Sequence, residues 1–346
     1  MAFTMPHLSQ FRQLVNTPQR TVVTTHYMPD ADAMGSSLAL AAYLRKKGHS
    51  VSVISPSDYP DFLGWMAGNE AVINMEAGNK KKARALIEEA NLIFCLDFNS
   101  PKRINSLGEM LQNASGIKVL VDHHLDPEPF AQFALWDTRA AATAELVFSL
   151  ILSLGDRHLI DSDMADCLYA GIMTDTGQYK HPNTTRNVHL VTADLIELGA
   201  DTARVGRLIY DNNSLDRLRF TGFALSERLK VLVNYRTAYF KISLNDLKRY
   251  KSRTGDTEGL VNYGLSLKGV VFSALIIERK DQIRLSLRSK GDFSVSDFAR
   301  VHFDGGGHAN AAGGTSELSL DETEKKFVHI LKQYKNILHE NHQKES

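Results

Sequence analysis

The sequence predicts an α/β protein of two domains, and three observations carry this prediction. Short apolar runs alternate with amphipathic stretches through the first 200 residues, which is typical of a mostly parallel sheet flanked by helices. A mainly helical stretch follows, and apolar runs return after Leu229. With 346 residues, the chain is long enough for two separate cores. We therefore expect one domain at 1–205, a helical connector at 206–226 and a smaller α/β domain at 227–346.

In the first domain, four apolar runs predict strands that are buried on both faces. They are TVVTT (21–25), VSVIS (51–55), LIFCL (92–96) and KVLV (118–121). Residues 35–47 carry small and apolar side chains at helical spacing, and Gly48 follows where a helix would end. Residues 80–90 predict a second helix. The alternation of strand and helix favours a parallel sheet.

The rest of the chain divides into a helical and a strand-rich part. Apolar residues three and four apart predict helices within 141–152, 164–173, 187–199 and 202–211. Four apolar runs then predict the strands of the second domain, at 230–235, 237–243, 269–278 and 282–289. The last two flank ERKDQ, which favours a hairpin turn.

Composition excludes several classes of function. Apolar content is 43% and charged content 23%, as in ordinary globular proteins. The 40 basic and 40 acidic residues give no net charge, which argues against a long track for duplex DNA but permits a local basic pocket. No apolar run reaches the about 18–20 residues of a membrane helix, and the N-terminus has no signal-peptide pattern. Cys95 and Cys167 form no CxxC motif. We expect a cytoplasmic protein without membrane partners.

Polar side chains follow the predicted strands at the points where they end. Ligands bind at the carboxyl ends of the strands in such sheets, so these segments are expected to meet. In an extended loop Asp30 and Asp32 would point to the same side, and their mutual repulsion would be relieved by divalent cations. Imidazole and carboxylate without thiolate suit Mn²⁺, Mg²⁺, Fe²⁺ or Co²⁺ better than structural zinc. The candidates are His26, Asp30, Asp32, Asp97, Asp122, His123, His124 and Asp175.

Each of these residues also has a structural interpretation. An Asp after a strand is often a helix N-cap, and a single His is more often a surface or core residue than a ligand. The pair His123 and His124 directly after Asp122 is harder to explain in this way. The joint occurrence of all candidates at element ends in one domain favours a functional centre.

These motifs resemble the four motifs of the DHH phosphoesterase superfamily: His26-xxx-Asp30-x-Asp32, Asp97, Asp122-His123-His124 and Asp175. The segment GGGHANAAGG at 305–314 is similar to the signature of the DHH-associated C-terminal domain. The resemblance covers nearly the whole chain. Length and layout are most similar to stand-alone members that act as oligoribonucleases and as phosphatases of 3′-phosphoadenosine 5′-phosphate (pAp).

The resemblance implies a centre with two Mn²⁺ ions, for which Mg²⁺, Fe²⁺ or Co²⁺ are alternatives. It implies one ion on His26, Asp30 and Asp97, and a second on Asp32, Asp97, His123 and Asp175. Asp122 is then expected to orient His123. His124 is expected to face the substrate phosphate as a hydrogen-bond donor or as the acid for the leaving oxygen.

The activity that the resemblance implies is hydrolysis by attack of a metal-bound hydroxide on phosphorus. The expected substrates are short RNA oligonucleotides, cleaved to mononucleotides, and pAp, cleaved to AMP and phosphate. A cyclic-di-AMP or pApA phosphodiesterase is a second enzymatic hypothesis, and a nucleotide-binding regulator is a non-enzymatic one. The active site is expected in the cleft between the two domains. Family members often dimerise, so a homodimer is a further expectation.

The second domain is expected to hold the substrate. Strand alternation places Arg284, Ser286 and Arg288 on one face, and the family resemblance adds Ser289 as a contact to a terminal phosphate or base. Gly305, Gly306 and Gly307 would permit a tight turn close to an anion, with His308 at the start of a small helix. The alternatives are a solvated strand face and a flexible loop. Arg139 and Thr143, in RAAATAE, are weaker candidates for lining the site, as are His181 and Tyr27.

Overall fold

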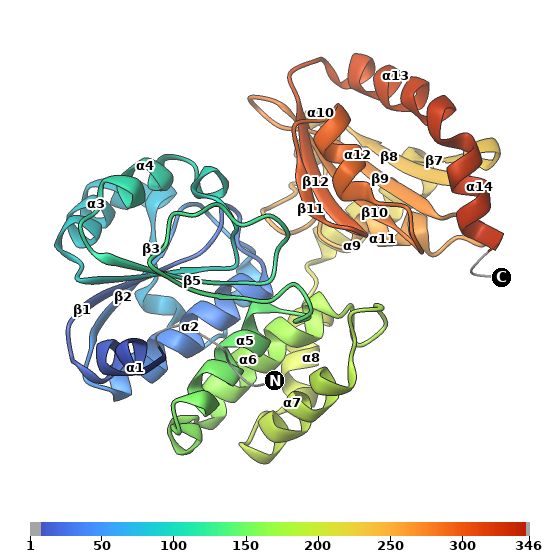
Figure 1. The fold of residues 1–346 in the computed structure, drawn as a ribbon. Coiled ribbons are helices and arrows are strands. Elements are labelled where there is room, and N and C mark those ends of the chain that lie inside the picture. Colours follow the sequence, from blue (N-terminus) through green and yellow to red (C-terminus); the bar gives the residue numbers. More distant parts are fainter. Residues whose placement is uncertain (1–7, 344–346) are drawn as a thin grey trace. The chain divides into compact units, whose positions relative to one another are not determined.

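The computed structural model describes residues 8–343, and these divide into two units between Asn212 and Asn213 (Figure 1). The division lies within the stretch predicted as a connector. Each unit has its own six-stranded sheet covered by helices. The predicted class, two α/β domains with a parallel sheet in the first, is therefore confirmed.

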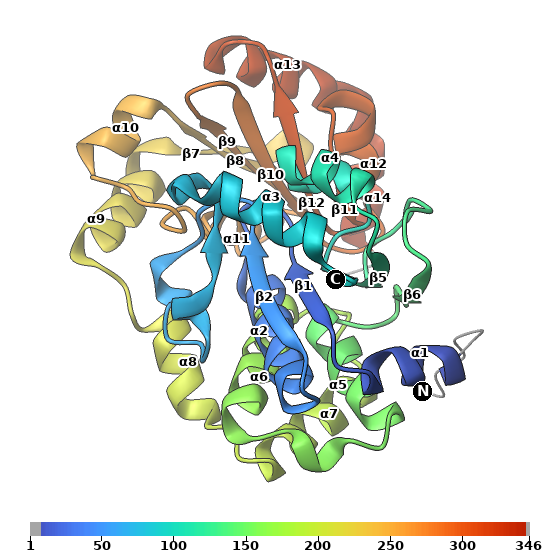
Figure 2. The same cartoon turned by 90° about the vertical axis from the view of Figure 1, so that its left-hand side faces the viewer.

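The sheet of the first unit is entirely parallel, with the order β3-β2-β1-β4-β5-β6. Figure 2 shows β1 and β2 side by side and running in the same direction. The four predicted strands are all present, and two short strands at the edges were not predicted. The strands are β1 Arg20–Thr24, β2 Ser50–Ser55, β3 Ile73–Asn74, β4 Leu92–Leu96, β5 Ile117–Asp122 and β6 Phe133–Trp136.

Successive side chains of the central strands enter two different cores, which is why these strands are apolar throughout. On β4, Phe94 and Leu96 pack into one core, while Ile93 and Cys95 pack into the other. The second core is covered by α3 Lys80–Glu89 and α4 Ser106–Asn113. The first is covered by α1 Leu8–Asn16, α2 Ala31–Lys46, α5 Thr143–Ser153, α6 Ser162–Asp175, α7 Arg186–Glu197 and α8 Thr202–Tyr210.

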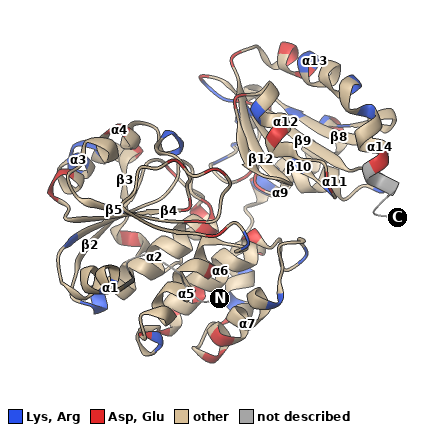
Figure 3. Cartoon of the chain, viewed as in Figure 1, with Lys and Arg blue, Asp and Glu red and all other residues tan. Residues whose placement is uncertain are grey.

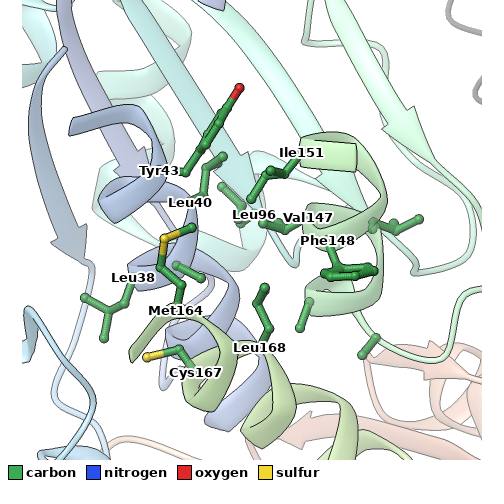
Figure 4. Close-up of a cluster of buried hydrophobic side chains, with 14 of the residues drawn as sticks. Leu38, Leu40, Tyr43, Leu96, Val147, Phe148, Ile151, Met164, Cys167 and Leu168 are labelled. Carbon is green, nitrogen blue, oxygen red and sulfur yellow. The ribbon is translucent and has the colours of Figure 1, made fainter. Parts of the chain in front are cut away.

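Helices α2, α5 and α6 form the dense part of the larger core (Figure 4). Leu38 of α2, Phe148 of α5 and Leu168 of α6 are all buried there. The backbones of α2 and α6 approach closely because Gly35 faces the carbonyl of Cys167, where a Cβ would collide. This close packing brings the start of α2 and the end of α6 into the same region.

The sheet of the second unit is mixed, with the order β11-β12-β10-β9-β8-β7 and one parallel pair, β8 with β9. The hairpin predicted at ERKDQ joins β9 to β10. The strands are β7 Leu229–Leu232, β8 Thr237–Ile242, β9 Phe272–Glu278, β10 Ile283–Ser289, β11 Gly306–His308 and β12 Ala311–Ser316. The helices are α9 Leu215–Phe223, α10 Leu244–Arg249, α11 Leu260–Leu265, α12 Val295–His302, α13 Leu320–Leu331 and α14 Lys335–Gln343.

Two expectations about the glycine-rich segment are wrong. Gly306, Gly307 and His308 form strand β11 rather than a tight turn, and no helix begins at His308. The turn comes later, at Ala309 and Asn310. The glycine at 305 serves a close approach between strands, because a Cβ there would collide with the carbonyl of Gly313.

The surface charges are mixed in sign on the outer helices, as Figure 3 shows for α13. None of the helices in residues 8–343 combines the length with the apolar character that crossing a bilayer requires.

Candidate metal centre

The predicted ligands of the first unit come together at the carboxyl ends of its strands. His26 follows β1, Asp97 follows β4, and His123 and His124 follow β5. Helix α2 contributes Asp30 at its N-cap and Asp32 in its first turn. The last residue of α6 is Asp175. Five separate segments thus bring buried or half-buried imidazoles and carboxylates to one place.

One group consists of His26, Asp30 and Asp97, whose ligand atoms lie within 4.8 Å of one another. His26 Nε2 is 3.4 Å from Asp97 Oδ2. The other ring nitrogen, Nδ1, donates to the carbonyl oxygen of Tyr27 at 3.0 Å. This hydrogen bond fixes the tautomer and leaves Nε2 as the nitrogen that can bind a cation.

A second group consists of Asp32, His123 and Asp175, again within 4.8 Å. His123 Nε2 is 3.3 Å from Asp175 Oδ2 and 3.4 Å from Asp97 Oδ1. Asp97 therefore faces His26 with one oxygen and His123 with the other, and we call it the shared carboxylate. The structure thus brings together the residues predicted as ligands, in two groups with Asp97 facing both.

Asp122 was expected to orient His123, but it contacts the next residue. Its Oδ1 lies 2.7 Å from Nδ1 of His124 instead. His123 is held by the backbone, because its Nδ1 donates to the carbonyl oxygen of Ala140 at 3.2 Å. Successive residues at a strand end point in different directions, so Asp122 can reach the second neighbour more easily than the first.

Asp30 is both a helix cap and a member of the first group. Its Oδ1 accepts hydrogen bonds from the backbone N–H groups of Asp32 and Ala33, each at 3.0 Å. The expected extended loop from Asp30 to Asp32 is wrong, because α2 begins at Ala31. The cap fixes the carboxylate of Asp30 at the carboxyl ends of the strands. Asp30 can therefore be a helix cap and a metal ligand at the same time.

The first residues of helix α5 donate hydrogen bonds to the carboxylates of Asp32 and Asp97. The backbone N–H groups of Thr143 and Ala144 donate to the two oxygens of Asp32 at 2.6 and 2.8 Å. The hydroxyl of Thr143 donates to Oδ1 of Asp97 at 2.9 Å. Sequence reasoning named Thr143 only as a weak candidate. A sequence feature that points to this role is the position of Thr143 at the start of an apolar helical run, where backbone N–H groups are available to bind an anion.

Gly171 was not identified from the sequence, although the centre depends on it. A Cβ at this position would lie 2.6 Å from Asp32 Oδ1 and 2.8 Å from the Cβ of Ala144. No side chain fits between α6 and the carboxylate. Only the packing of α2, α5 and α6 reveals this requirement.

The buried carboxylates and imidazoles of the centre shift one another's pKa values. Burial, together with Asp97 and Asp175, raises the pKa of Asp32 well above its usual range. Burial also raises the pKa of Asp175, to about 6, despite the hydrogen bond to His123. At Asp97 burial acts in the same direction, but hydrogen bonds from His123 and His26 outweigh it and the pKa is well below its usual range.

This donor set fits divalent cations. The two groups supply carboxylate and imidazole donors, and no cysteine takes part in either. Crowded buried carboxylates repel one another unless protons or cations neutralise them. Oxygen and imidazole donors without thiolate suit Mn²⁺, Mg²⁺ or Fe²⁺.

The predicted substrate residues of the second unit lie on β10 and β11. Arg284, Ser286 and Arg288 are half-buried on one face of β10, as alternation predicted. Ser289 lies on the opposite, buried face. Its hydroxyl donates to the carbonyl oxygen of Phe293 at 2.5 Å and accepts from Asn310 Nδ2 at 2.9 Å. In β11, Gly306 and Gly307 pair with Gly313 and Ala312, and His308 pairs with Ala311.

Comparison with known proteins supports the resemblance. The family model described as DHH family, N-terminal domain, matches residues 20–172, and the model described as DHHA1 domain matches residues 234–339. The chain is 26% identical over 307 residues to the bifunctional oligoribonuclease and PAP phosphatase NrnA of Bacillus subtilis, covering 88% of this chain and 91% of the relative.

Two further proteins are similar over most of their length. The protein of the same name from Thermus thermophilus is 28% identical over 317 residues, covering 90% of this chain and 89% of that protein. The crystal structure of an exopolyphosphatase-related protein from Bacteroides fragilis is 35% identical, with a TM-score of 0.91, covering 98% of this chain and 99% of that one.

Proposed function

Because the chain belongs to the DHH family and carries its DHHA1 domain, we propose that it hydrolyses short RNA oligonucleotides to mononucleotides and pAp to AMP and phosphate. The observation that carries this proposal is the pair of buried ligand groups that share Asp97. The substrates are those in the names of two relatives that resemble nearly the whole chain.

We assign the two groups to two divalent cations, with Mn²⁺ as the expected metal. His26, Asp30 and Asp97 hold one, and Asp32, Asp97, His123 and Asp175 hold the other. Bound cations activate a water molecule as the nucleophile and stabilise charge on the phosphoryl oxygens. The protein orients the ligands through Ala140, Tyr27 and the N-terminus of α5.

We assign to His124 the role of the acid that donates a proton to the leaving oxygen. Its Nδ1 donates to Asp122, so Nε2 is the atom that exchanges a proton with the substrate. Burial and the positive charge of Arg103 lower the pKa of His124, while Asp122 acts in the opposite direction. With Nδ1–H on Asp122, the acid form is the imidazolium, which carries its second proton on Nε2, and the lowered pKa makes this proton easier to give to the leaving oxygen.

The arginine face of β10 supplies cations for a substrate phosphate. Arg284 and Arg288 lie on that face with Ser286 between them, and a guanidinium can bind phosphate through two parallel hydrogen bonds. The placement of the substrate between the two domains stays a prediction, as do the homodimer and the cytoplasmic location.

The test is a time course of product formation with Mn²⁺, followed by chromatography. The substrates are pAp, a 5′-labelled RNA trimer, pApA and cyclic-di-AMP, each with the wild-type protein and with Asp97→Asn. Asp163→Asn is the matched control, because Asp163 is an exposed carboxylate at the opposite end of α6 from Asp175.

We expect release of AMP from pAp and of mononucleotides from the trimer, both lost in Asp97→Asn and kept in Asp163→Asn. Preferential cleavage of cyclic-di-AMP would replace the proposed substrates but leave the metal ligands in place. Nucleotide binding without turnover of any of the four compounds would favour a regulator.

A further inference from the structure

Trp136 is a large aromatic side chain exposed beside the metal centre. It ends strand β6, and 44% of its surface is accessible to solvent. Within residues 9–212 it is the one Phe, Tyr or Trp side chain that is exposed, since the others are buried or half-buried. An indole in water leaves an apolar face without a partner, although single exposed apolar residues are common.

The indole is fixed in place by the segment that carries the catalytic candidates. Its Nε1 donates to the backbone carbonyl oxygen of His124 at 2.6 Å. In the parallel pairing of β5 with β6, Trp136 lies opposite Asp122. Its ring is therefore held at one edge by the chain of the Asp-His-His motif, while much of its surface faces solvent.

This hydrogen bond connects the ring to the shared carboxylate through one residue. The backbone carbonyl of His124 accepts from the indole, and the imidazole of the same residue has Nδ1 3.6 Å from Asp97 Oδ1 and 2.7 Å from Asp122 Oδ1. A pre-ordered aromatic face beside a phosphate-binding centre fits a ligand that joins a phosphate to a flat heteroaromatic ring.

We propose that Trp136 is a stacking platform for the nucleobase of the nucleotide whose phosphate is at the metal centre. This proposal rests on the proposed function and adds the recognition of a base to it. Stacking uses the face of the ring, which every base has, so the platform accepts different bases. It distinguishes nucleotides from phosphate compounds that lack a base, such as sugar phosphates and inorganic polyphosphate.

Fluorescence tests the stacking without any turnover. The chain has two tryptophans, Trp65 and Trp136, so Trp65→Phe leaves Trp136 as the single emitter. The Trp65→Phe protein loaded with Mg²⁺ is titrated with AMP, which is a product of the proposed reaction, and, as the base-free control, with ribose 5-phosphate. We expect AMP to quench the emission to saturation and ribose 5-phosphate to leave it unchanged. Equilibrium dialysis under the same conditions measures AMP binding independently.

Kinetics on the metal-loaded protein separates the ring from its hydrogen bond. Trp136→Ala removes both, whereas Trp136→Phe keeps an aromatic face and removes the donor to His124. If the ring stacks on a base, KM for pAp rises about 10-fold in Trp136→Ala, changes little in Trp136→Phe, and kcat changes less than KM in both. Melting curves of both variants show whether they are folded.

Three outcomes would overturn the platform. These are AMP binding by dialysis without quenching, no AMP binding up to millimolar concentration, and an unchanged KM in Trp136→Ala. Equal defects in Trp136→Phe and Trp136→Ala would instead assign the role to the hydrogen bond with His124. Failure of the wild-type protein to cleave pAp or RNA would refute the proposed function, while quenching by AMP would still support the platform.

Discussion

The hydroxyl of Thr143 reaches the shared carboxylate from a neighbouring helix. It donates to Asp97 Oδ1 at 2.9 Å, and both residues are buried. Asp97 is the carboxylate that we propose to bind both cations, and neighbours that orient a ligand typically contribute about 10-fold or more to metal affinity or activity. Thr143 is thus a positioning residue.

We expect Thr143→Val to lower kcat for pAp about 10- to 100-fold and to weaken Mn²⁺ binding. The isosteric valine leaves a buried oxygen of Asp97 without this donor. Thr143→Ser restores the hydroxyl and should restore most of both quantities. The measurements are kcat and a Mn²⁺ titration; a Thr143→Val protein with wild-type metal affinity and kcat would contradict the assignment.

The pairing of Asp122 with His124 leads to a different expectation. Asp122→Asn keeps the size of the side chain but removes the charge that holds Nδ1 of His124 as a donor. His123 donates to the backbone and faces Asp97 with its other ring nitrogen, so metal binding should persist. We expect kcat to fall about 100-fold, with Mn²⁺ affinity within about 3-fold of wild type. A loss of Mn²⁺ binding in this variant would restore the original expectation that Asp122 supports a ligand.

At the level of elements, the packing of three helices creates the space in which Asp32 lies. Helix α6 has Gly171 where it passes the carboxylate, and α8 has Gly206 with no atom within 4 Å of an added Cβ. Both glycines are within helices and neither has a positive φ. The two positions therefore form a matched pair for the same substitution.

We expect Gly171→Ala to destabilise the protein by about 1–3 kcal/mol, because the methyl group overpacks Asp32 and Ala144. Activity should fall as well, since Asp32 has to move. Gly206→Ala should stabilise by about 0.5–1 kcal/mol through helix propensity. Urea unfolding and pAp hydrolysis measure both effects, and equal behaviour of the two variants would rule out the steric argument.

Helix α13 is attached to the second sheet through Glu324. Its carboxylate accepts from Lys230 Nζ at 2.6 Å, Tyr239 Oη at 2.8 Å and Lys241 Nζ at 2.7 Å. Burial alone would raise the pKa of Glu324, but these three donors outweigh it and lower the pKa to about 2. The folded pKa is thus below that of the unfolded chain.

The sign of the pH dependence follows from this lowered pKa. The stabilisation is present above the unfolded pKa, near 4.5, and is lost as the pH falls toward about 2. Allowing for screening by solvent, we expect Glu324→Gln to cost about 1–2 kcal/mol at pH 7 and much less at about pH 2.5. Urea unfolding at both values measures this, with the exposed Glu317→Gln as the control. A constant difference between the two pH values would contradict the charge interpretation.

The sequence predicted well those strands that are continuous apolar runs. The four buried runs of the first sheet became strands because both of their faces meet a core. Strand β6 was missed, since its half-exposed edge sequence FALW has no clear alternation. Strand β11 was taken for a turn, because glycines favour turns locally and only pairing with β12 makes them a strand. Contacts between distant segments decided both cases.

The same distinction applies to the site at the scale of the whole molecule. Local motifs were sufficient to identify the residues that gather in the two ligand groups. The contacts of these residues could not be predicted, because Thr143, which was only a weaker candidate, and Gly171 approach Asp32 from helices that are far away in the chain. The pairing of His124 rather than His123 with Asp122 depends on side-chain directions at a strand end.

The metal centre also couples chemistry to the stability of one unit. All proposed ligands belong to residues 1–212, and the two units have separate apolar cores. A cation that binds only the native state stabilises it by an amount that grows with concentration, about 2.7 kcal/mol at 100 times Kd. Mn²⁺ should therefore raise the melting temperature of the first unit and leave that of the second unchanged.

The size of this shift should depend on pH, since metal ligands have to lose their protons. At about pH 5.5 Asp175, with a pKa of about 6, and Asp32, with a strongly raised pKa, carry protons that a cation has to displace. Mn²⁺ competes with these protons, so its shift of the first transition should be larger at about pH 8 than at about pH 5.5. Calorimetry with Mn²⁺ and with a chelator measures both transitions. Asp97→Asn should abolish the shift and Asp163→Asn should keep it, whereas an equal shift in both variants would place the cation elsewhere.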